Sequence, residues 1–473
     1  MTSPMSAENA LVRLAALLDP ESVRTDEEAR SRAVASWSPL FFKQRRPDGG
    51  ASLAPLPDAV ALPSDTAQVA AIVRWANENR AALVPVGGAS NTVGANAVPT
   101  GRAGSVVAVD LSRLDTLRWD EESLLAHVGA GVNLGALEER LNAHDYTLGH
   151  LPQSLHLATV GGAVATNAVG LLSGRYGRQR DLTAGLEVVL PTGETLHTTP
   201  GMDTAFDLHD LLIGSEGAFG IVTEASLRIR PVPNVRAWAS FTFPNFADGI
   251  DAVRLIYRSD ARPATVRLID PDSARERLYA LGTYTPAALL LLAFEGDELV
   301  QTGSYQVAYA ICQRIGGKDR SPELGETWFE EARTQSGWMS ANARPGGIAD
   351  MLAVFAPWSV IKGVEAAVRK AISPLVRELE VHLGHPSIEG AALDIRFSAD
   401  ANPATPEGAI ALYQRIADAG LTAALAAGGS VTHHFGIGQT RRAYFERERG
   451  PVAMAALRAI KGALDPNGVL PAI

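Results

Sequence analysis

The sequence has a single cysteine, Cys312, among 473 residues. An intramolecular disulfide and a cysteine-based zinc site are therefore excluded, and nothing requires an oxidising compartment. The longest apolar run, Ala287–Phe294, is far shorter than the roughly 20 residues that span a bilayer. The N-terminus lacks a cationic segment followed by an apolar core, and the C-terminal Pro471-Ala472-Ile473 is no peroxisomal address. These absences predict a cytoplasmic protein without a transmembrane segment.

Positive charge is also scarce. Asp and Glu number 52 against 42 Lys and Arg, which gives a formal net charge of −10, so nucleic acid is not an expected partner. The basic residues are mostly arginine, which is typical of a GC-rich bacterial genome. A hydrophobic fraction of 46% and a charged fraction of 20% are those of a globular protein, and the length allows two or three domains.

Small residues, in contrast, gather in turns. Gly87-Gly88-Ala89-Ser90-Asn91 follows a predicted strand at Leu83–Val86, and Gly161-Gly162 lies in a small-residue helix that Thr159 opens. Gly214-Ser215-Glu216-Gly217 precedes another strand. Such turns let the backbone approach a ligand closely and present several N–H donors at once, as a pyrophosphate requires. No GxGxxG motif follows a strand, so a Rossmann nucleotide site is not supported.

Hydrophobic periodicity outlines the elements of the chain's first half. Residues 1 to about 55 are interpreted as an irregular entry segment. A helix is predicted at Asp65–Asn79, capped by Ser64 or Asp65, and another at Leu134–Ala143. The pattern at Gly185–Leu196 predicts a hairpin. Helices and strands alternate here, as in an α+β domain.

Composition shifts after Pro233. Strands are predicted at 237–243, 265–268, 288–294, 352–355, 380–383 and 391–398. Helices are predicted at 246–258, 359–378, 406–425 and 443–464, the last ending at Asp465-Pro466-Asn467-Gly468. A further helix is predicted between the strand at 288–294 and Ile315. This order favours an antiparallel sheet with helices on one face. No internal repeat is visible in the sequence.

Eight segments, in order, carry a resemblance to a known family. They are Pro85–Gly94, Leu151–Gly170, Ser173–Leu182, Gly214–Pro233, Ala264–Asp270, Leu291–Asp297, Gly428–Gly438 and Leu464–Leu470. The set resembles the FAD-linked oxidases of the vanillyl-alcohol-oxidase, or PCMH, type. Within that superfamily it is most similar to the alkyldihydroxyacetonephosphate synthases.

The resemblance implies an α+β fold with a PCMH-type FAD-binding domain of two α+β subdomains and a ferredoxin-like antiparallel-sheet cap. The implied boundaries are an entry segment at 1–55, the FAD-binding domain at 56–233, the cap at 234–440 and a C-terminal helical segment at 441–473 that returns to the FAD-binding domain. A homodimer is implied by the resemblance only.

The resemblance also implies FAD as the cofactor. The residues expected to hold it are Pro85, Val86, Gly87, Gly88, Ala89, Ser90, Asn91, Thr92, Pro152, Gln153, Ser154, Thr159, Gly161, Gly162, Thr166, Asn167, Gly170, Glu216, Gly217, Gly220, Ile221 and Val222. Many relatives attach FAD through a histidine in the first glycine turn, and this chain has none there, so non-covalent FAD is expected. A tether from a cap-domain histidine stays open.

Histidines in the second half are the candidates for proton transfer. His433 and His434 lie between glycines, in a segment similar to the histidine run of the synthases, where the third histidine is here Phe435. Either histidine could take the hydroxyl proton while hydride leaves for FAD N5; a surface or capping pair is the alternative interpretation.

Other polar residues are expected to set the substrate. Arg267 matches an arginine of the synthase active site, and Asp394 falls where the synthases carry a tyrosine; both are predicted catalytic. Asp394 and Arg396 project from the same face of one strand; a solvent-exposed face is the alternative interpretation. His382, His385, Arg396 and Phe435 are predicted to contact the substrate. A two-histidine metal half-site at 382 and 385 is an alternative, but no metal is expected.

These residues favour an FAD-dependent oxidase or dehydrogenase acting on the CH–OH group of a polar small molecule: a 2-hydroxy acid, a sugar or a natural-product intermediate. Electrons would pass to O₂ or an unknown acceptor. The first alternative is a synthase-like enzyme that uses flavin without net redox, favoured by the histidine pair and Arg267 but opposed by the missing tyrosine. The second is a flavin-binding protein with a degraded site.

Overall fold

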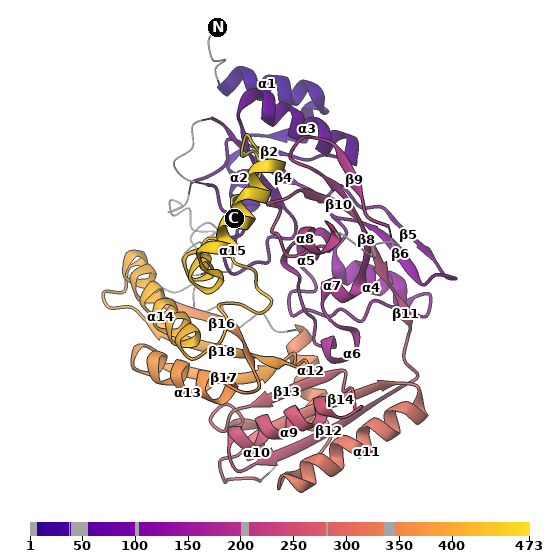
Figure 1. The fold of residues 1–473 in the computed structure, drawn as a ribbon, viewed down its shortest axis with the longest axis vertical. Helices are drawn as coiled ribbons and strands as arrows, with labels where there is room; N and C mark the ends of the chain where they lie inside the picture. Colours follow the sequence, from indigo (N-terminus) through magenta and orange to yellow (C-terminus); the bar gives the residue numbers. More distant parts are fainter. Residues whose placement is uncertain are drawn as a thin grey trace.

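A computed structural model of the chain describes residues 7–36, 38, 55–99, 104–199, 208–280, 282–334 and 346–473. Figure 1 shows the first half of the chain above and beside a broad sheet formed by the second half, with the C-terminal helix running back to the first half. The predicted α+β class is confirmed, because mostly antiparallel sheets alternate with helices throughout these residues.

A four-stranded sheet carries the first glycine turn at the end of one strand. Its order is β1 (Val23–Arg24), β2 (Ala59–Ala61), β4 (Val106–Asp110) and β3 (Ala82–Val86), with β2 and β3 parallel to β4. Helix α3 (Thr66–Asn79) connects β2 to β3, and the Asp65 side chain caps it by accepting from Gln68 N, as predicted. The turn 87–92 therefore leaves the carboxyl end of a buried strand.

The prediction of an irregular entry segment was wrong. Helices α1 (Ala7–Leu17) and α2 (Glu27–Ala33) lie within it. Leu14 and Leu18 are buried in the same core as α3, and α1 packs on α3. The helical spacing of Ala10, Leu14 and Leu18 is the signal that was missed.

A five-stranded sheet carries the later turns. Its order is β5 (Leu117–Asp120), β6 (Leu125–Gly129), β10 (Ile221–Arg228), β8 (Thr183–Val189) and β9 (Thr195–His197), and every pairing is antiparallel. The predicted hairpin is confirmed as β8 and β9. The helices of this part are α4 (Leu134–Asn142), α5 (Val160–Thr166), α6 (Ser173–Tyr176), α7 (Gln179–Leu182) and α8 (Leu208–Leu212). A small ribbon pairs β7 (Tyr146–Thr147) with β11 (Arg230–Pro231).

The second half forms a seven-stranded antiparallel sheet of order β15-β12-β14-β13-β17-β18-β16 (Figure 1). Its strands are β12 (Val235–Phe243), β13 (Thr265–Ile269), β14 (Ala288–Gly296), β15 (Lys318–Arg320), β16 (Gly347–Pro357), β17 (Glu378–Gly384) and β18 (Gly390–Asp400). Its main helices are α9 (Phe246–Arg258), α11 (Glu298–Arg314), α13 (Ile361–Ile372) and α14 (Pro406–Ala426). The order β15-β12-β14-β13 is that of a ferredoxin-like βαββαβ unit.

The topology contains a repeat that the sequence does not show. The succession β12-α9-β13-β14-α11 is followed by β16-α13-β17-β18-α14, and β13 pairs with β17 to join the two units. In the first unit, β15 pairs with the edge of β12. In the second, the loop 430–441 takes that place beside β16: Ser430 N donates to Phe355 O at 2.8 Å, and His433 N donates to Ala353 O at 2.9 Å. The candidate histidines are therefore held on a sheet edge.

Two further expectations for this half were wrong. Helices cover both faces of the sheet, because α12 (Glu323–Thr334) packs on the face opposite α9 and α11, where Phe329 meets Trp238 with ring centroids 5.3 Å apart. Helix α13 ends at Ile372 rather than near Glu378, since Pro374 follows within a short 3₁₀ turn. A short helix, α10 (Arg275–Ala280), also precedes β14.

The C-terminal helix α15 (Arg442–Leu464) is kinked at Gly450, which has φ +74° before Pro451. It ends at Leu464, as predicted, and the chain then returns to the first sheet, where Leu83 N donates to Val469 O at 2.7 Å. Among the described residues, no helix is both long and apolar enough to cross a bilayer.

Candidate active site

A cavity lies between the glycine turns of the first half and the sheet of the second half. Its first-half wall comes from 85–92, 152–171 and 212–222, and its second-half wall includes Arg267, His385, Asp394, His434 and Phe435. The predicted cofactor residues all line it except Asn167, which ends α5 with φ +47° and accepts a hydrogen bond from Arg180 N. One continuous space thus joins the two sets of residues that the sequence singles out.

The first glycine turn fits a phosphate-bearing group. Within the described residues, the backbone N–H groups of 87–92 donate no hydrogen bond, although this turn follows directly on the paired strand β3. A Cβ at Gly88 would lie 1.7 Å from Leu157 O, and one at Gly87 would lie 2.4 Å from Thr159 Oγ1. Glycine is required at both positions, and the open N–H groups are the donors that a pyrophosphate needs.

The start of helix α5 offers fewer free N–H donors to a cofactor than the sequence predicts. Thr159 does cap this helix by accepting from Gly162 N, as predicted. However, Val160 N donates to Val132 O and Gly161 N donates to Ala130 O, so these N–H groups are already paired. A Cβ at Gly161 would lie 2.7 Å from the Ala130 Cβ, so this glycine serves helix packing.

Glu216 connects the third turn to the loop that carries the histidines. Its carboxylate accepts from Ile437 N at 2.7 Å and from Gly438 N at 2.9 Å. Burial raises the pKa of this carboxyl, against the lowering effect of the two backbone N–H donors. A Cβ at Gly436 would lie 1.9 Å from Glu216 Oε1, which explains the glycine there.

Arg267 and Asp394 form a buried ion pair in the second-half wall. Arg267 Nη1 lies 2.5 Å from Asp394 Oδ2, and the side chains are 3% and 2% exposed. The guanidinium reaches β18 across the intervening strand β17 at Gly384, where a Cβ would lie 3.2 Å from Arg267 Cζ. Trp328 of α12 covers the guanidinium, 5.2 Å from its ring centroid. The alternative of a solvent-exposed face at Asp394 is excluded by this burial.

This ion pair is only half satisfied. Arg267 Nε and Asp394 Oδ1 have no hydrogen-bond partner among the described residues. Burial raises the pKa of Asp394, but the charge and hydrogen bond of Arg267, together with His434 and His385, outweigh it and hold that pKa well below its usual range. Both side chains line the cavity, although these two unpaired atoms are themselves covered by protein.

Three histidines form a cluster at the other side of the wall. His433 and His434 come from the loop 430–441, and His385 follows β17 with φ +48°. His433 stacks between Phe355 and His385, at centroid distances of 5.9 and 6.1 Å. His434 meets the His385 ring edge-on at 5.0 Å. We call His385, His433 and His434 the histidine cluster.

The histidine cluster is neutral. Burial lowers the pKa of His385 and of His434 to about 3, with the nearby Arg267 adding to the effect on both. Burial and the adjacent His434 hold the pKa of His433 well below its usual range. Neutral imidazoles can accept or donate a proton in the cavity.

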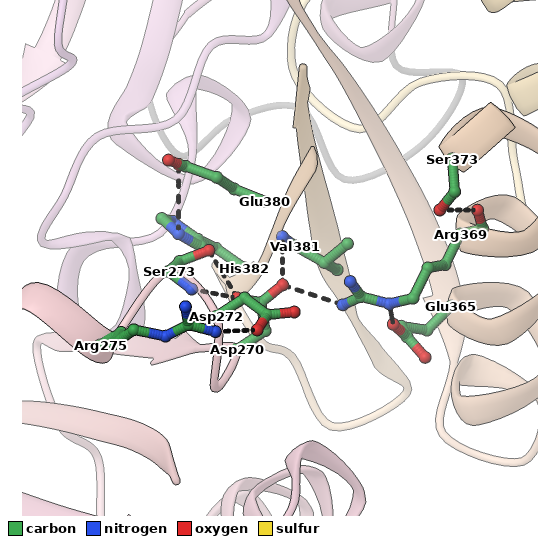
Figure 2. Close-up of polar contacts among 10 residues, drawn as sticks. All are labelled: Asp270, Asp272, Ser273, Arg275, Glu365, Arg369, Ser373, Glu380, Val381 and His382. Atoms are coloured by element: carbon green, nitrogen blue, oxygen red, sulfur yellow. Dashed lines mark hydrogen bonds and ion pairs between the residues drawn. The ribbon is translucent and has the colours of Figure 1, made fainter. Parts of the chain in front are cut away.

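His382 and Arg396 lie outside the cavity wall. His382 stands opposite Asp394 in the sheet, and Arg396 stands opposite Glu380. Figure 2 shows the His382 ring beside Glu380, with Nε2 at 3.8 Å from Oε2. We assign both residues to the polar layer that flanks Asp394 rather than to direct substrate contact. The proposed half-site with His385 has no support in their contacts, since His385 instead meets Ser173, and no group of three metal ligands occurs among the described residues.

Asp270, the last residue of the Ala264–Asp270 segment, anchors the strand that carries Arg267. Its buried carboxylate accepts from Ser273 N, Arg369 Nη2 and Val381 N, at 2.8, 2.9 and 2.9 Å (Figure 2). These bonds tie the end of β13 to α13 and to β17. The neighbouring Asp272 is exposed, and in the described part of the chain its ion pair is with Arg275.

Sequence reasoning missed several residues of the site. Arg178 Nη2 contacts His433 Nε2 at 2.6 Å, and Ser173 Oγ contacts His385 Nδ1 at 2.8 Å. Both lie in the Ser173–Leu182 segment, whose resemblance was the available signal. Arg333 and Asp350 also line the cavity, and burial raises the pKa of Asp350 to about 6. Nothing in the sequence around these two marked them.

Comparisons with known proteins agree with this division of the chain. Residues 57–199 match the model of an FAD binding domain, and residues 232–472 match that of the C-terminal domain of FAD linked oxidases. The glycines at 87–88 and 161–162 fall within the first matched region and the cap histidines within the second, while the turn 214–217 lies between the two.

Two relatives and one solved structure illustrate the similarity. The chain is 26% identical to an alkyldihydroxyacetonephosphate synthase of Caenorhabditis elegans, over 88% of this chain and 75% of that protein. It is 28% identical to the mitochondrial D-lactate dehydrogenase [cytochrome] of Arabidopsis thaliana, over 88% and 72%. A solved alkyldihydroxyacetonephosphate synthase superposes with a TM-score of 0.80 at 22% identity, over 99% of this chain and 85% of that one. The predicted fold is thereby confirmed.

Proposed function

The chain belongs to the FAD-linked oxidases, and on that premise we propose that it oxidises the CH–OH group of a small 2-hydroxy acid. It is an FAD-dependent enzyme of the oxidase and dehydrogenase class. This substrate class is narrower than the set of polar alcohols that the sequence predicts.

The half-satisfied ion pair carries this proposal. Arg267 and Asp394 both line the cavity, and each keeps one buried polar atom, Nε and Oδ1, without a partner among the described residues. A 2-hydroxy acid brings both groups on adjacent carbons, since its carboxylate accepts and its hydroxyl donates. A simple alcohol would leave the arginine unpaired, which costs about 1–3 kcal/mol for a buried polar group.

The residues of the chain then divide the work. The backbone N–H groups of 87–92, which donate to no described residue, would hold the pyrophosphate of FAD. Bound FAD supplies a two-electron acceptor that takes hydride at N5. Arg267 and Asp394 orient the acid, and the histidine cluster takes the hydroxyl proton, because neutral imidazoles lie in the same wall.

Further parts of the proposal come from the sequence. FAD is bound without a covalent link, which is supported by the absence of histidine in the first turn and by the burial of Cys312 in α11. A cytoplasmic location, O₂ or another molecule as electron acceptor, and a homodimer stay predictions.

Anaerobic mixing of the FAD-loaded protein with a panel of compounds tests the proposal. The panel pairs each 2-hydroxy acid with the alcohol that lacks its carboxylate, and adds sugars. Lasting bleaching of the visible flavin band by 2-hydroxy acids, and not by their matched alcohols, is expected. Bleaching by sugars or plain alcohols alone would overturn the assignment of substrate class.

A synthase-like exchange without net redox is the second candidate. The similarity over most of the chain, the adjacent His433 and His434, and Arg267 favour it. Asp394 at the predicted place of the tyrosine opposes it. Product exchange on an acyl-ketone phosphate, with no lasting bleaching by any alcohol, would support this candidate instead.

A further inference from the structure

Arg178 reaches the histidine cluster from the other half of the chain. It lies between α6 and α7, where its backbone N donates to Asp181 Oδ2 at 2.9 Å. Its side-chain Nη2 lies 2.6 Å from His433 Nε2. His433 Nδ1 in turn lies 2.9 Å from His434 Nδ1. A chain of contacts therefore runs from a guanidinium through one ring to a ring that lines the cavity.

The chemistry of these groups decides where each proton sits. A guanidinium has donors only and stays protonated, so His433 Nε2 must be the acceptor. A neutral imidazole carries one N–H, which for His433 must then be on Nδ1. That N–H donates to His434 Nδ1, so the single proton of His434 is on Nε2. The burial that lowers the pKa of both rings keeps them in this neutral form.

We propose that Arg178 is a positioning residue that fixes the tautomers of His433 and His434, so that His434 presents an N–H donor rather than a proton acceptor to the cavity. The inference rests on the proposed function for its catalytic meaning, and on the contacts alone for the tautomers. Among the described residues, His434 Nε2 has no hydrogen-bond partner, so this donor is available to a substrate oxygen.

The proton acceptor is then His385. Its Nδ1 contacts Ser173 Oγ at 2.8 Å, and within the described chain its Nε2 has no hydrogen-bond partner. A serine hydroxyl can donate or accept, and in the tautomer whose Nδ1–H donates to it, Nε2 keeps its lone pair for the substrate. The O–H proton would go to His385 Nε2, and the hydrogen of the C–H bond would leave with its electron pair as the hydride that bound flavin would accept. The carbonyl forms, and His434 Nε2–H donates to its oxygen.

Nitrogen-15 NMR of the FAD-loaded protein, with labelled histidines, tests the tautomers without any substrate. Long-range proton–nitrogen correlations distinguish protonated from unprotonated ring nitrogens, and H433Q and H434Q assign two of the ten histidines. The expected result is a proton on Nδ1 of His433 and on Nε2 of His434. An unprotonated His434 Nε2 in the wild type would overturn the inference.

Variants of Arg178 show whether the arginine sets this state. R178M should shift the nitrogen signals of His433 and His434, while R178K, which keeps a cationic donor, should restore them. R180M is the matched control, because Arg180 is exposed and pairs with Asp210. If R178M leaves the nitrogen signals unchanged, the arginine does not fix the tautomers of His433 and His434.

A kinetic measurement separates the acceptor from the donor. H385Q should abolish flavin reduction by the fastest acid of the panel and leave the tautomers of His433 and His434 unchanged. Rapid reduction by H385Q would contradict the acceptor role. If no acid reduces the flavin, the proposed function is wrong, whereas the NMR measurement still tests the histidine tautomers independently.

Discussion

At the residue scale, the pairing of Arg267 with Asp394 links stability and recognition. Both side chains are buried, so removing either partner alone leaves an uncompensated charge. R267M and D394L should each lower the free energy of unfolding by about 3–5 kcal/mol. The double variant R267M/D394L should recover most of that loss, since a buried pair can be replaced by apolar residues.

The double variant also separates folding from binding. It should fold and retain FAD, yet lose the preference for a 2-hydroxy acid over its matched alcohol in anaerobic flavin reduction. Denaturant unfolding and the panel measurements check the two parts. If the stable double variant still prefers a 2-hydroxy acid over its matched alcohol, the ion pair does not recognise the substrate.

The residues that bear the chemistry were predicted unevenly. The histidine pair, Arg267 and Asp394 were singled out because the segments that contain them resemble those of the synthases. His382 does not line the cavity, since strand alternation predicts the face on which a residue lies but not its distance from a cavity. Arg178 was missed because its partner is 255 residues away in sequence, and local patterns carry no information on such contacts.

At the element scale, Glu216 holds the loop 430–441 against the first half of the chain. E216A should free Ile437 N and Gly438 N and let the histidines shift. The rate of flavin reduction should fall by about 100-fold, because small misplacements of catalytic groups are that costly. E216Q, which keeps one acceptor oxygen, should lose less. Equal rates in E216A and the wild type would contradict the role of this link.

A second prediction at this scale concerns Asp270, which anchors the end of strand β13. D270A removes the acceptor for Ser273, Arg369 and Val381, and should lower the free energy of unfolding by about 3–5 kcal/mol. The control D272A removes only an exposed pair and should cost less than about 0.5 kcal/mol. Denaturant unfolding compares them. A similar small loss in both would show that Asp270 does not anchor the strand.

Most elements of the fold could be predicted, and the failures have local causes. Strands such as β14 and caps such as Asp65 follow from apolar runs and side-chain acceptors. Helix α1 was missed because its apolar spacing is short and flanked by polar residues. The repeated topology of the sheet was invisible, because hydrophobic alternation constrains the face of each strand but not the order in which strands pair.

At the scale of the whole molecule, buried neutral histidines predict how stability depends on pH. The pKa of His150 is lowered by burial to about 4, and those of His385 and His434 to about 3. The unfolded chain therefore binds more protons below the ordinary histidine pKa of about 6.5. The contribution of these histidines to the free energy of unfolding is therefore fully present above about pH 6.5 and is lost as the pH falls.

Between pH 6.5 and 5.5 each of these histidines should cost about 1 kcal/mol of the free energy of unfolding. Denaturant unfolding at pH 7.5, 6.5 and 5.5 measures the net change, to which the raised pKa of Asp350 contributes in the opposite direction, and H150Q should reduce the loss by about 1 kcal/mol. A free energy of unfolding that stays constant from pH 7.5 to 5.5 would contradict the burial of neutral rings.

The division of the molecule into a cofactor half and a substrate half, with a cavity between them, leads to one central claim: hydride leaves the carbon of a 2-hydroxy acid for FAD. The most direct test compares anaerobic flavin bleaching by the fastest acid of the panel with bleaching by the same acid carrying deuterium at C2. We expect several-fold slower bleaching by the deuterated acid. Equal rates at saturating acid, or no lasting bleaching by either form, would contradict the claim.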